Sequence, residues 1–175
     1  MIMGLSIRAF TQLHVLISLI GIATGIGVLS AMLQGHYARR RTAAFLFTTI
    51  ATSVTGFMFG SKFGPPHAIG VISLAVLAVA LAALYGFKLQ GWWRWVYVTS
   101  AVLALYLNMF IAVVQTFQKV TFFHALAPTQ AEPPFAVAQG ILLLTLIALG
   151  VLAARRFHPT IDSVASNQVT YRGST

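Results

Sequence analysis

The sequence predicts an all-α membrane protein, a polytopic bundle of five transmembrane helices with the N-terminus outside and the C-terminus in the cytoplasm. Three observations predict it: composition, five long apolar segments, and an uneven distribution of Lys and Arg. The 175 residues are 58% apolar and only 7% charged, whereas soluble domains carry charge on roughly a quarter of their residues. The chain has too little polar surface for a water-soluble particle, so we expect a lipid bilayer to cover part of it.

Five segments are apolar enough to cross a bilayer core of about 30 Å, which takes roughly 20 residues. The expected spans are residues 10–33, 42–59, 66–87, 92–117 and 134–154. The second span is the least apolar because it is rich in Thr. Residues 1–158 therefore form one five-helix transmembrane domain. The polar stretch 159–175 has no apolar periodicity and is predicted to be a disordered cytoplasmic tail.

Lys and Arg set the predicted orientation, because cytoplasmic loops are enriched in them. With five spans, eight of the eleven fall on one side of the membrane and three on the other. The eight are residues 39–41, 88, 94, 155, 156 and 172, and the three are residues 8, 62 and 119. A cleaved signal peptide over residues 1–30 is an alternative. Cleavage would leave the three arginines 39–41 on the translocated side, against the charge rule.

Composition also excludes several kinds of function. The net charge is +9, and the basic residues responsible for it lie between apolar runs. We therefore expect them to face anionic lipid rather than nucleic acid. The absence of cysteine excludes thiolate chemistry. Neither acidic residue, Glu132 or Asp162, lies inside a span, which disfavours an ordinary proton-coupled transporter. No zinc-protease, nucleophile-elbow or phosphate-loop motif is present, so we assign no catalytic residue and do not expect an enzyme.

Polar and small side chains share one helical face in three of the expected spans. They are His14, Ser18, Gly21 and Gly25 in the first, Thr48, Thr52 and Thr55 in the second, and Asn108, Gln115 and Lys119 in the fourth. Helix packing alone accounts for many such stripes, because Gly-x-x-x-Gly allows close approach and Thr can bond to its own helix. An amide such as that of Asn108 is costly to bury without a partner. Its face should therefore point into the bundle.

Five spans bring most of the intramembrane polar residues to the outer side. His14 lies about one turn inside the first span, and His67 begins the third. We predict an outward-opening polar pocket with the 119–133 loop as its lid. The candidate ligand-binding residues are His14, His67, Asn108, Gln115, His124 and Glu132.

Histidine is the commonest metal ligand and an axial haem ligand. The pocket could therefore hold a transition metal on His14 and His67, one b-type haem, or a quinone-like ligand. The histidine spacing matches no metal motif, and hydrogen-bonded packing histidines are the plainer interpretation. The inner halves of the spans contain no histidine, which disfavours a chain of two haems across the membrane.

Three functions stay open at this point. The protein is an accessory or assembly subunit, whose glycine and threonine faces dock another membrane protein or a second copy of this chain. Alternatively, it binds a metal, haem or quinone-like ligand in the outward-facing pocket. In the third case it transports a small solute, with Asn108 and Gln115 lining the path.

Three stretches carry a resemblance to a known family. They are LHVLISLIGI at 13–22, TSVTGF at 52–57 and LAPTQAEPPF at 126–135. Together they resemble an uncharacterised family of small bacterial multi-pass membrane proteins over roughly residues 10 to 158. The resemblance implies a bacterial inner-membrane location. It implies no activity and no catalytic residue, because none is assigned to that family.

Overall fold

The structure, a computed structural model, describes residues 6–59 and 64–159, and these contain helices and no strand. The helices are α1 (Ile7–Leu33), α2 (Arg39–Gly56), α3 (Pro65–Leu81) with a π-helical turn η1 (Ala82–Gly86), α4 (Trp93–Lys119), α5 (Thr121–Leu126) and α6 (Pro133–Arg156). The fold is all-helical, as predicted, and short helix α5 was not foreseen. Two parts of these predictions lie outside the described residues. They are Lys62 and residues 160–175 of the predicted disordered tail, which include Asp162 and Arg172.

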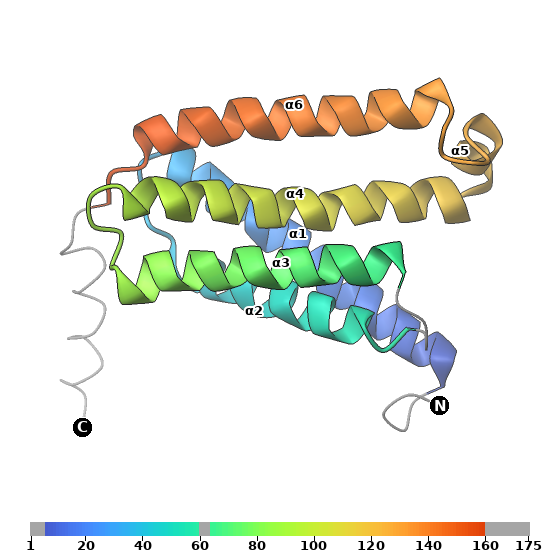
Figure 1. The fold of residues 1–175 in the computed structure, drawn as a ribbon, viewed down its shortest axis with the longest axis horizontal. Coiled ribbons are helices and arrows are strands. Elements are labelled where there is room, and N and C mark those ends of the chain that lie inside the picture. Colours follow the sequence, from blue (N-terminus) through green and yellow to red (C-terminus); the bar gives the residue numbers. More distant parts are fainter. Residues whose placement is uncertain (1–5, 60–63, 160–175) are drawn as a thin grey trace.

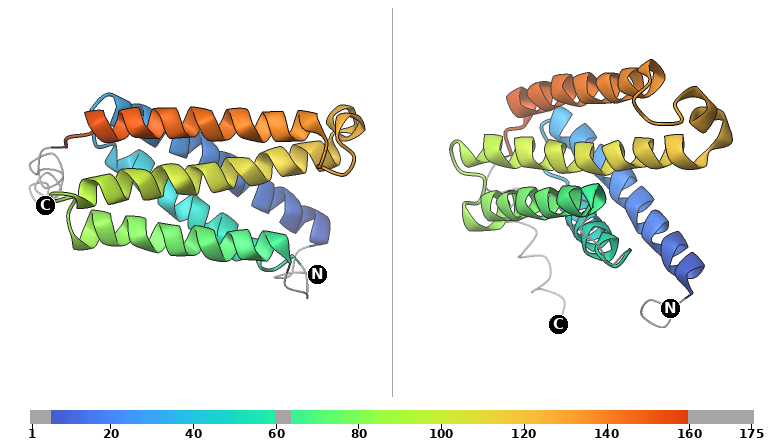
Figure 2. Two further views of the ribbon diagram at one scale, coloured as in Figure 1. Left: turned by 45° about the horizontal axis from the view of Figure 1, so that its top comes forward. Right: turned by 45° about the vertical axis from the view of Figure 1, so that its right-hand side comes forward.

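The five long helices run up and down, each antiparallel to the next (Figure 1). Helices α3, α4 and α6 lie side by side, and α1 and α2 pass behind them. The second half of α1 contacts α4 and α6, whereas its first half diverges from α4, as the right-hand view of Figure 2 shows.

Helix starts follow local rules. Ser6 caps α1, because its Oγ accepts a hydrogen bond from the N–H of Ala9 at 3.2 Å. Helices α3 and α6 begin at Pro65 and Pro133, where the fixed φ of proline suits the first turn.

Within residues 6–59 and 64–159, four helical segments are long and apolar enough to cross a membrane: α1, residues 67–86, α4 and α6. They leave many apolar side chains exposed, and on α6 Ile141, Leu144 and Ile147 are each more than half exposed. Lipid would cover such a surface, as in a membrane protein. Helix α2 is not apolar enough to be counted with these four segments. Its 18 residues begin with three arginines and include five threonines, so the predicted count of five spans is not confirmed.

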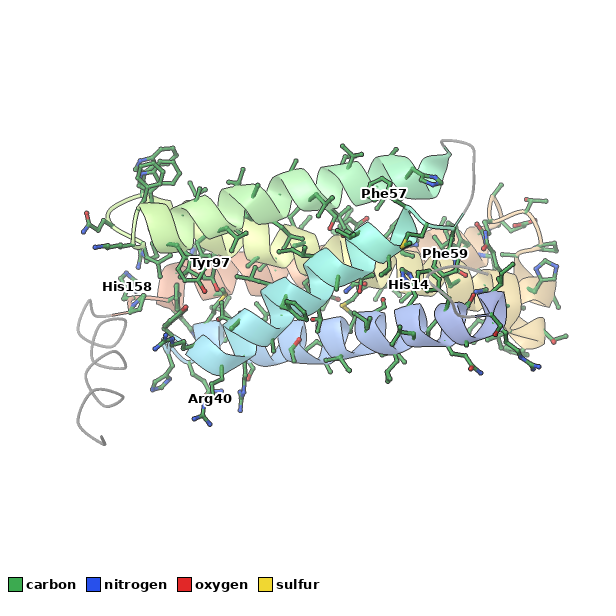
Figure 3. The ribbon with its side chains drawn as sticks, turned by 90° about the horizontal axis from the view of Figure 1, so that it is seen from below. His14, Arg40, Phe57, Phe59, Tyr97 and His158 are labelled. Atoms are coloured by element: carbon green, nitrogen blue, oxygen red, sulfur yellow. The ribbon has the colours of Figure 1, made fainter. Side chains whose placement is uncertain are left out.

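The tightest packing lies in the half of the bundle nearest the basic loops. Phe45, Tyr97, Leu105 and Phe157 are at most 1% exposed. A Cβ added at Gly25 would lie 2.8 Å from Leu105 Cδ1 and from a ring carbon of Phe45, so glycine is what lets α1 approach here. Figure 3 shows Tyr97 at the end of the bundle opposite His14. The half of the bundle that contains His14 is less densely packed.

Candidate functional site

A cavity of about 580 Å³ lies between α1, α2, α3 and α4 in the half away from the basic loops. Its polar lining consists of Thr11, His14, Ser18, Thr49, Thr52, Ser53, His67, Ser73, Asn108, Gln115, Thr116 and Lys119. Aliphatic side chains such as Val15, Leu107 and Ile111 complete the wall. The exposed lining residues are Lys119 and Val120 at the end of α4 and Val15 and Leu19 on α1, so the cavity is open at that end and along the side of α1.

His14, on α1, is held from two sides. Its Nδ1 lies 2.8 Å from Thr55 Oγ1 on α2, and its ring meets that of Phe59 edge-on at 5.0 Å. Figure 3 shows both rings at this end of the bundle. The single hydroxyl proton of Thr55 is donated to the carbonyl of Ala51 at 2.7 Å. With that proton on the Ala51 carbonyl, Thr55 Oγ1 can accept a hydrogen bond from His14 Nδ1, and Nε2 of the neutral ring then has a lone pair.

His67, in the first turn of α3, has the opposite arrangement. The N–H of Gly64 donates to His67 Nδ1 at 3.2 Å, so Nδ1 is unprotonated and Nε2 of the neutral ring carries the proton. The ring packs against Phe57, with centroids 5.8 Å apart. In this way His67 ties the start of α3 to the end of α2.

Asn108, from the middle of α4, forms the floor of the cavity. It is 7% exposed, and its Oδ1 accepts a hydrogen bond from Ser18 Oγ on α1 at 2.9 Å. A Cβ added at Gly21 would lie 3.0 Å from Asn108 Nδ2 and 3.5 Å from Thr49 Oγ1. Glycine therefore makes room for the amide, which is a more specific role than general helix packing.

Four buried polar atoms on the cavity lining have no hydrogen-bond partner in the described part of the protein. They are Thr49 Oγ1, Thr52 Oγ1, Asn108 Nδ2 and Gln115 Oε1. A buried polar group without a partner costs about 1–3 kcal/mol. The residues that carry these atoms line one cavity, so a rotation of their side chains would let water or a ligand supply the missing bonds. The cavity offers both donors and acceptors for this purpose.

Sequence reasoning missed part of the floor. Ser53 on α2 donates to Ser73 on α3 at 3.2 Å, and both are at most 9% exposed. Apart from His67 in the first turn, Ser73 is the one polar residue of α3, and nothing in the sequence pattern marks it. Thr49 lies next to the predicted threonine face of α2. It precedes Ser53 by four residues, so the two share one helical face, and this spacing could have predicted both as lining residues.

The structure places four of the six candidate residues on the cavity and two away from it. His14, His67, Asn108 and Gln115 line it, whereas His124 and Glu132 do not. His124 is exposed on α5, where Phe123 packs on Phe117 of α4 at 5.3 Å. The predicted lid lies beside α4 and α6, and only Lys119 and Val120 of the 119–133 loop belong to the lining.

Glu132 organises the start of α6 instead. Its carboxylate accepts hydrogen bonds from the hydroxyl of Thr129 at 2.9 Å and from the amides of Thr129 and Ala131, both at 3.1 Å. Desolvation raises the pKa of Glu132, but these hydrogen bonds together lower the pKa by more, so it lies below its usual value.

A metal on His14 and His67 stays a prediction, and the two rings are not equally prepared for it: the lone pair of His14 Nε2 is available to a metal. Holding a metal on His67 Nε2 would require loss of its proton or of the hydrogen bond from Gly64. Among the described residues there is no group of three or more His, Cys, Asp or Glu side chains that could hold a metal ion. The same protonation pattern disfavours a haem held by both rings. Organic groups that donate and accept hydrogen bonds match the cavity better.

Comparison of the chain with protein-family models, with curated proteins and with solved structures finds no match.

Proposed function

We propose that this protein is an integral membrane protein that binds a small organic ligand in the cavity between α1, α2, α3 and α4. One observation carries the proposal: four residues with a buried, unpartnered polar atom line one cavity of about 580 Å³. Ligand sites of about 300–1,000 Å³ combine mostly apolar walls with a few converging polar groups. A quinone-like carbonyl compound belongs to this chemistry.

Binding is better supported than transport or docking. In the described part of the chain, the floor of the cavity at Asn108 is followed by the tight contact of Gly25 with Leu105 and Phe45, and this contact separates the cavity from the basic end. The accessory-subunit hypothesis relies on a glycine and a threonine face, but Gly21 and Gly25 pack within the chain, and Thr52 lines the cavity. Another membrane protein or a second copy could not pack on the glycine face without displacing these contacts.

We further propose that α2 is a fifth span, that the cavity opens to the outside, and that the protein resides in a bacterial inner membrane. Helices α1 and α3 point the same way in Figure 1, and α2 runs back between them. In the part of the chain that is described, seven cationic side chains lie at the end opposite the cavity. They are Arg39, Arg40, Arg41, Lys88, Arg94, Arg155 and Arg156. The positive-inside rule places that end in the cytoplasm.

Native mass spectrometry of protein extracted from its own membranes tests ligand binding. The wild type should retain one small molecule of defined mass. Ala112→Phe, which projects a ring into the cavity, should lose it. Ala148→Phe makes the same change on the exposed face of α6 and should keep the molecule. A wild type that carries nothing, or an Ala112→Phe variant that retains the molecule, would overturn the proposal.

A further inference from the structure

The described lining of the cavity carries a net positive charge. Lys119 is the one charged side chain among its described lining residues. The chain has only two acidic residues. Glu132 is not on the lining and is bonded to Thr129 and Ala131, and Asp162 lies outside the described residues. A positive charge at the rim of a low-dielectric cavity attracts anions and repels cations.

The polar groups along α4 are spread over the length of the cavity. Asn108, Ala112, Gln115 and Lys119 all line it, which their spacing of four, three and four residues explains. Lys119 lies eleven residues after Asn108, or about 16 Å along the helix axis. Ile111 and, on α1, Val15 supply apolar wall between the ends.

We propose that the ligand is an elongated organic anion. Its carboxylate lies at Lys119 in the mouth, its apolar body follows α4, and an acceptor group at its far end receives a hydrogen bond from Asn108 Nδ2. This inference rests on the ligand-binding function proposed above. The donor on the floor is a second observation, separate from the charge at the mouth: Asn108 Nδ2 is buried and has no partner among the described residues.

The test uses 11-(dansylamino)undecanoic acid, which has a carboxylate at one end and sulfonyl acceptors at the other. Its primary amide is the neutral probe of matched shape. Fluorescence titrations use protein in phosphatidylcholine nanodiscs, with empty nanodiscs subtracted. The acid should bind saturably and about fivefold more tightly than the amide, as expected for a partly exposed ion pair.

Variants then assign the preference to Lys119. Lys119→Gln should bind acid and amide equally, and Lys119→Arg should keep the preference. Arg8→Gln removes an exposed charge near the same end that does not line the cavity, so it should keep the preference too. Asn108→Leu should weaken both probes, because both carry the acceptor.

The outcomes separate the two proposals. If acid and amide bind wild type equally, the anion inference is wrong while ligand binding stands. If neither probe binds saturably, ligand binding fails as well. If Lys119→Gln keeps the preference, or Arg8→Gln loses it, Lys119 is not the partner of the carboxylate. Nanodiscs that also contain phosphatidylglycerol should give the same preference. Its loss there would show that a lipid headgroup occupies Lys119 and would overturn the ligand carboxylate.

Discussion

His14 and His67 line the same cavity but are held in different tautomers by the bonds at their Nδ1 atoms. His14 donates from Nδ1 to Thr55, and His67 accepts at Nδ1 from Gly64. At the residue scale, each ring is fixed by a neighbouring element, and its partner decides which nitrogen carries the proton. The sequence could suggest that both residues belong to one site, but not these partners.

Nitrogen-15 NMR of ring-labelled protein should find His14 protonated at Nδ1 and His67 protonated at Nε2. In Thr55→Val, His14 loses its acceptor and should shift toward the Nε2 tautomer, which is the more stable one in free imidazole side chains. His67 should not change. Thr24→Val is the control, because the Thr24 hydroxyl bonds only within α1. The same tautomer at both rings, or a His14 signal unaffected by Thr55→Val, would contradict the hydrogen-bond assignment.

Gly25 should be sensitive to a single methyl group. In Gly25→Ala the new Cβ would lie 2.8 Å from two fully buried side chains, and overpacking of this kind lowers the free energy of unfolding by about 1–3 kcal/mol. Gly140→Ala on α6 meets nothing within 4 Å and gains helix propensity. Thermal unfolding in detergent should show destabilisation in the first variant only. Equal stability of the two variants would argue against the close α1–α4 packing.

At the scale of elements, apolar runs predicted the long helices well, because lipid-facing helices need apolar residues on most sides. The sequence did not predict α5, since its six residues are set by contacts with α4 and have no periodicity of their own. The fourth and fifth predicted spans stop short of the helix ends, whereas the second runs past the end of α2 at Gly56. Helix α4 continues to Lys119 and α6 to Arg156, because a helix can continue into the interface after its apolar run ends.

The start of α6 should depend on pH through Glu132. Its pKa is lowered in the fold, so the carboxylate stabilises this turn above the pKa of the unfolded chain, and the effect is lost as the pH falls through the folded value. Hydrogen exchange at the Thr129 and Ala131 amides should speed up, relative to reference peptides, on acidification below about pH 4. Glu132→Gln should remove that acid transition. A wild-type turn that stays equally protected at low pH would contradict this role.

At the scale of the whole molecule, one half of the bundle is densely packed and the other is hollow. Topology and polarity were enough to predict that four residues line one cavity: His14, His67, Asn108 and Gln115. This prediction requires only the direction of each helix and the depth of each residue in the membrane. The positions of His124 and Glu132 depend on how the connecting segment packs on α4 and α6, which helical periodicity does not encode. The ligand-binding role of all six residues stays a prediction.

Reporter fusions test the proposed topology. Fusions after residues 41 and 88 and at the C-terminus should report from the cytoplasm, and fusions after residues 62 and 119 from the outside. This follows from the five-span arrangement and the cationic end described above. Fusions at 41 and 62 that report from the same side would show that α2 does not cross the membrane.

The most direct measurement is labelling of single cysteines with a membrane-impermeant methanethiosulfonate added outside intact cells. The chain has no native cysteine, so each substitution gives an isolated signal. Ala112→Cys and Gln115→Cys lie on the cavity lining, where water allows the reactive thiolate to form. They should react from outside, and Leu144→Cys, 68% exposed on the apolar face of α6, should be protected by lipid. Labelling of Leu144→Cys with protection of both cavity positions, or labelling of the cavity only after the cells are opened, would contradict an outward-facing polar cavity.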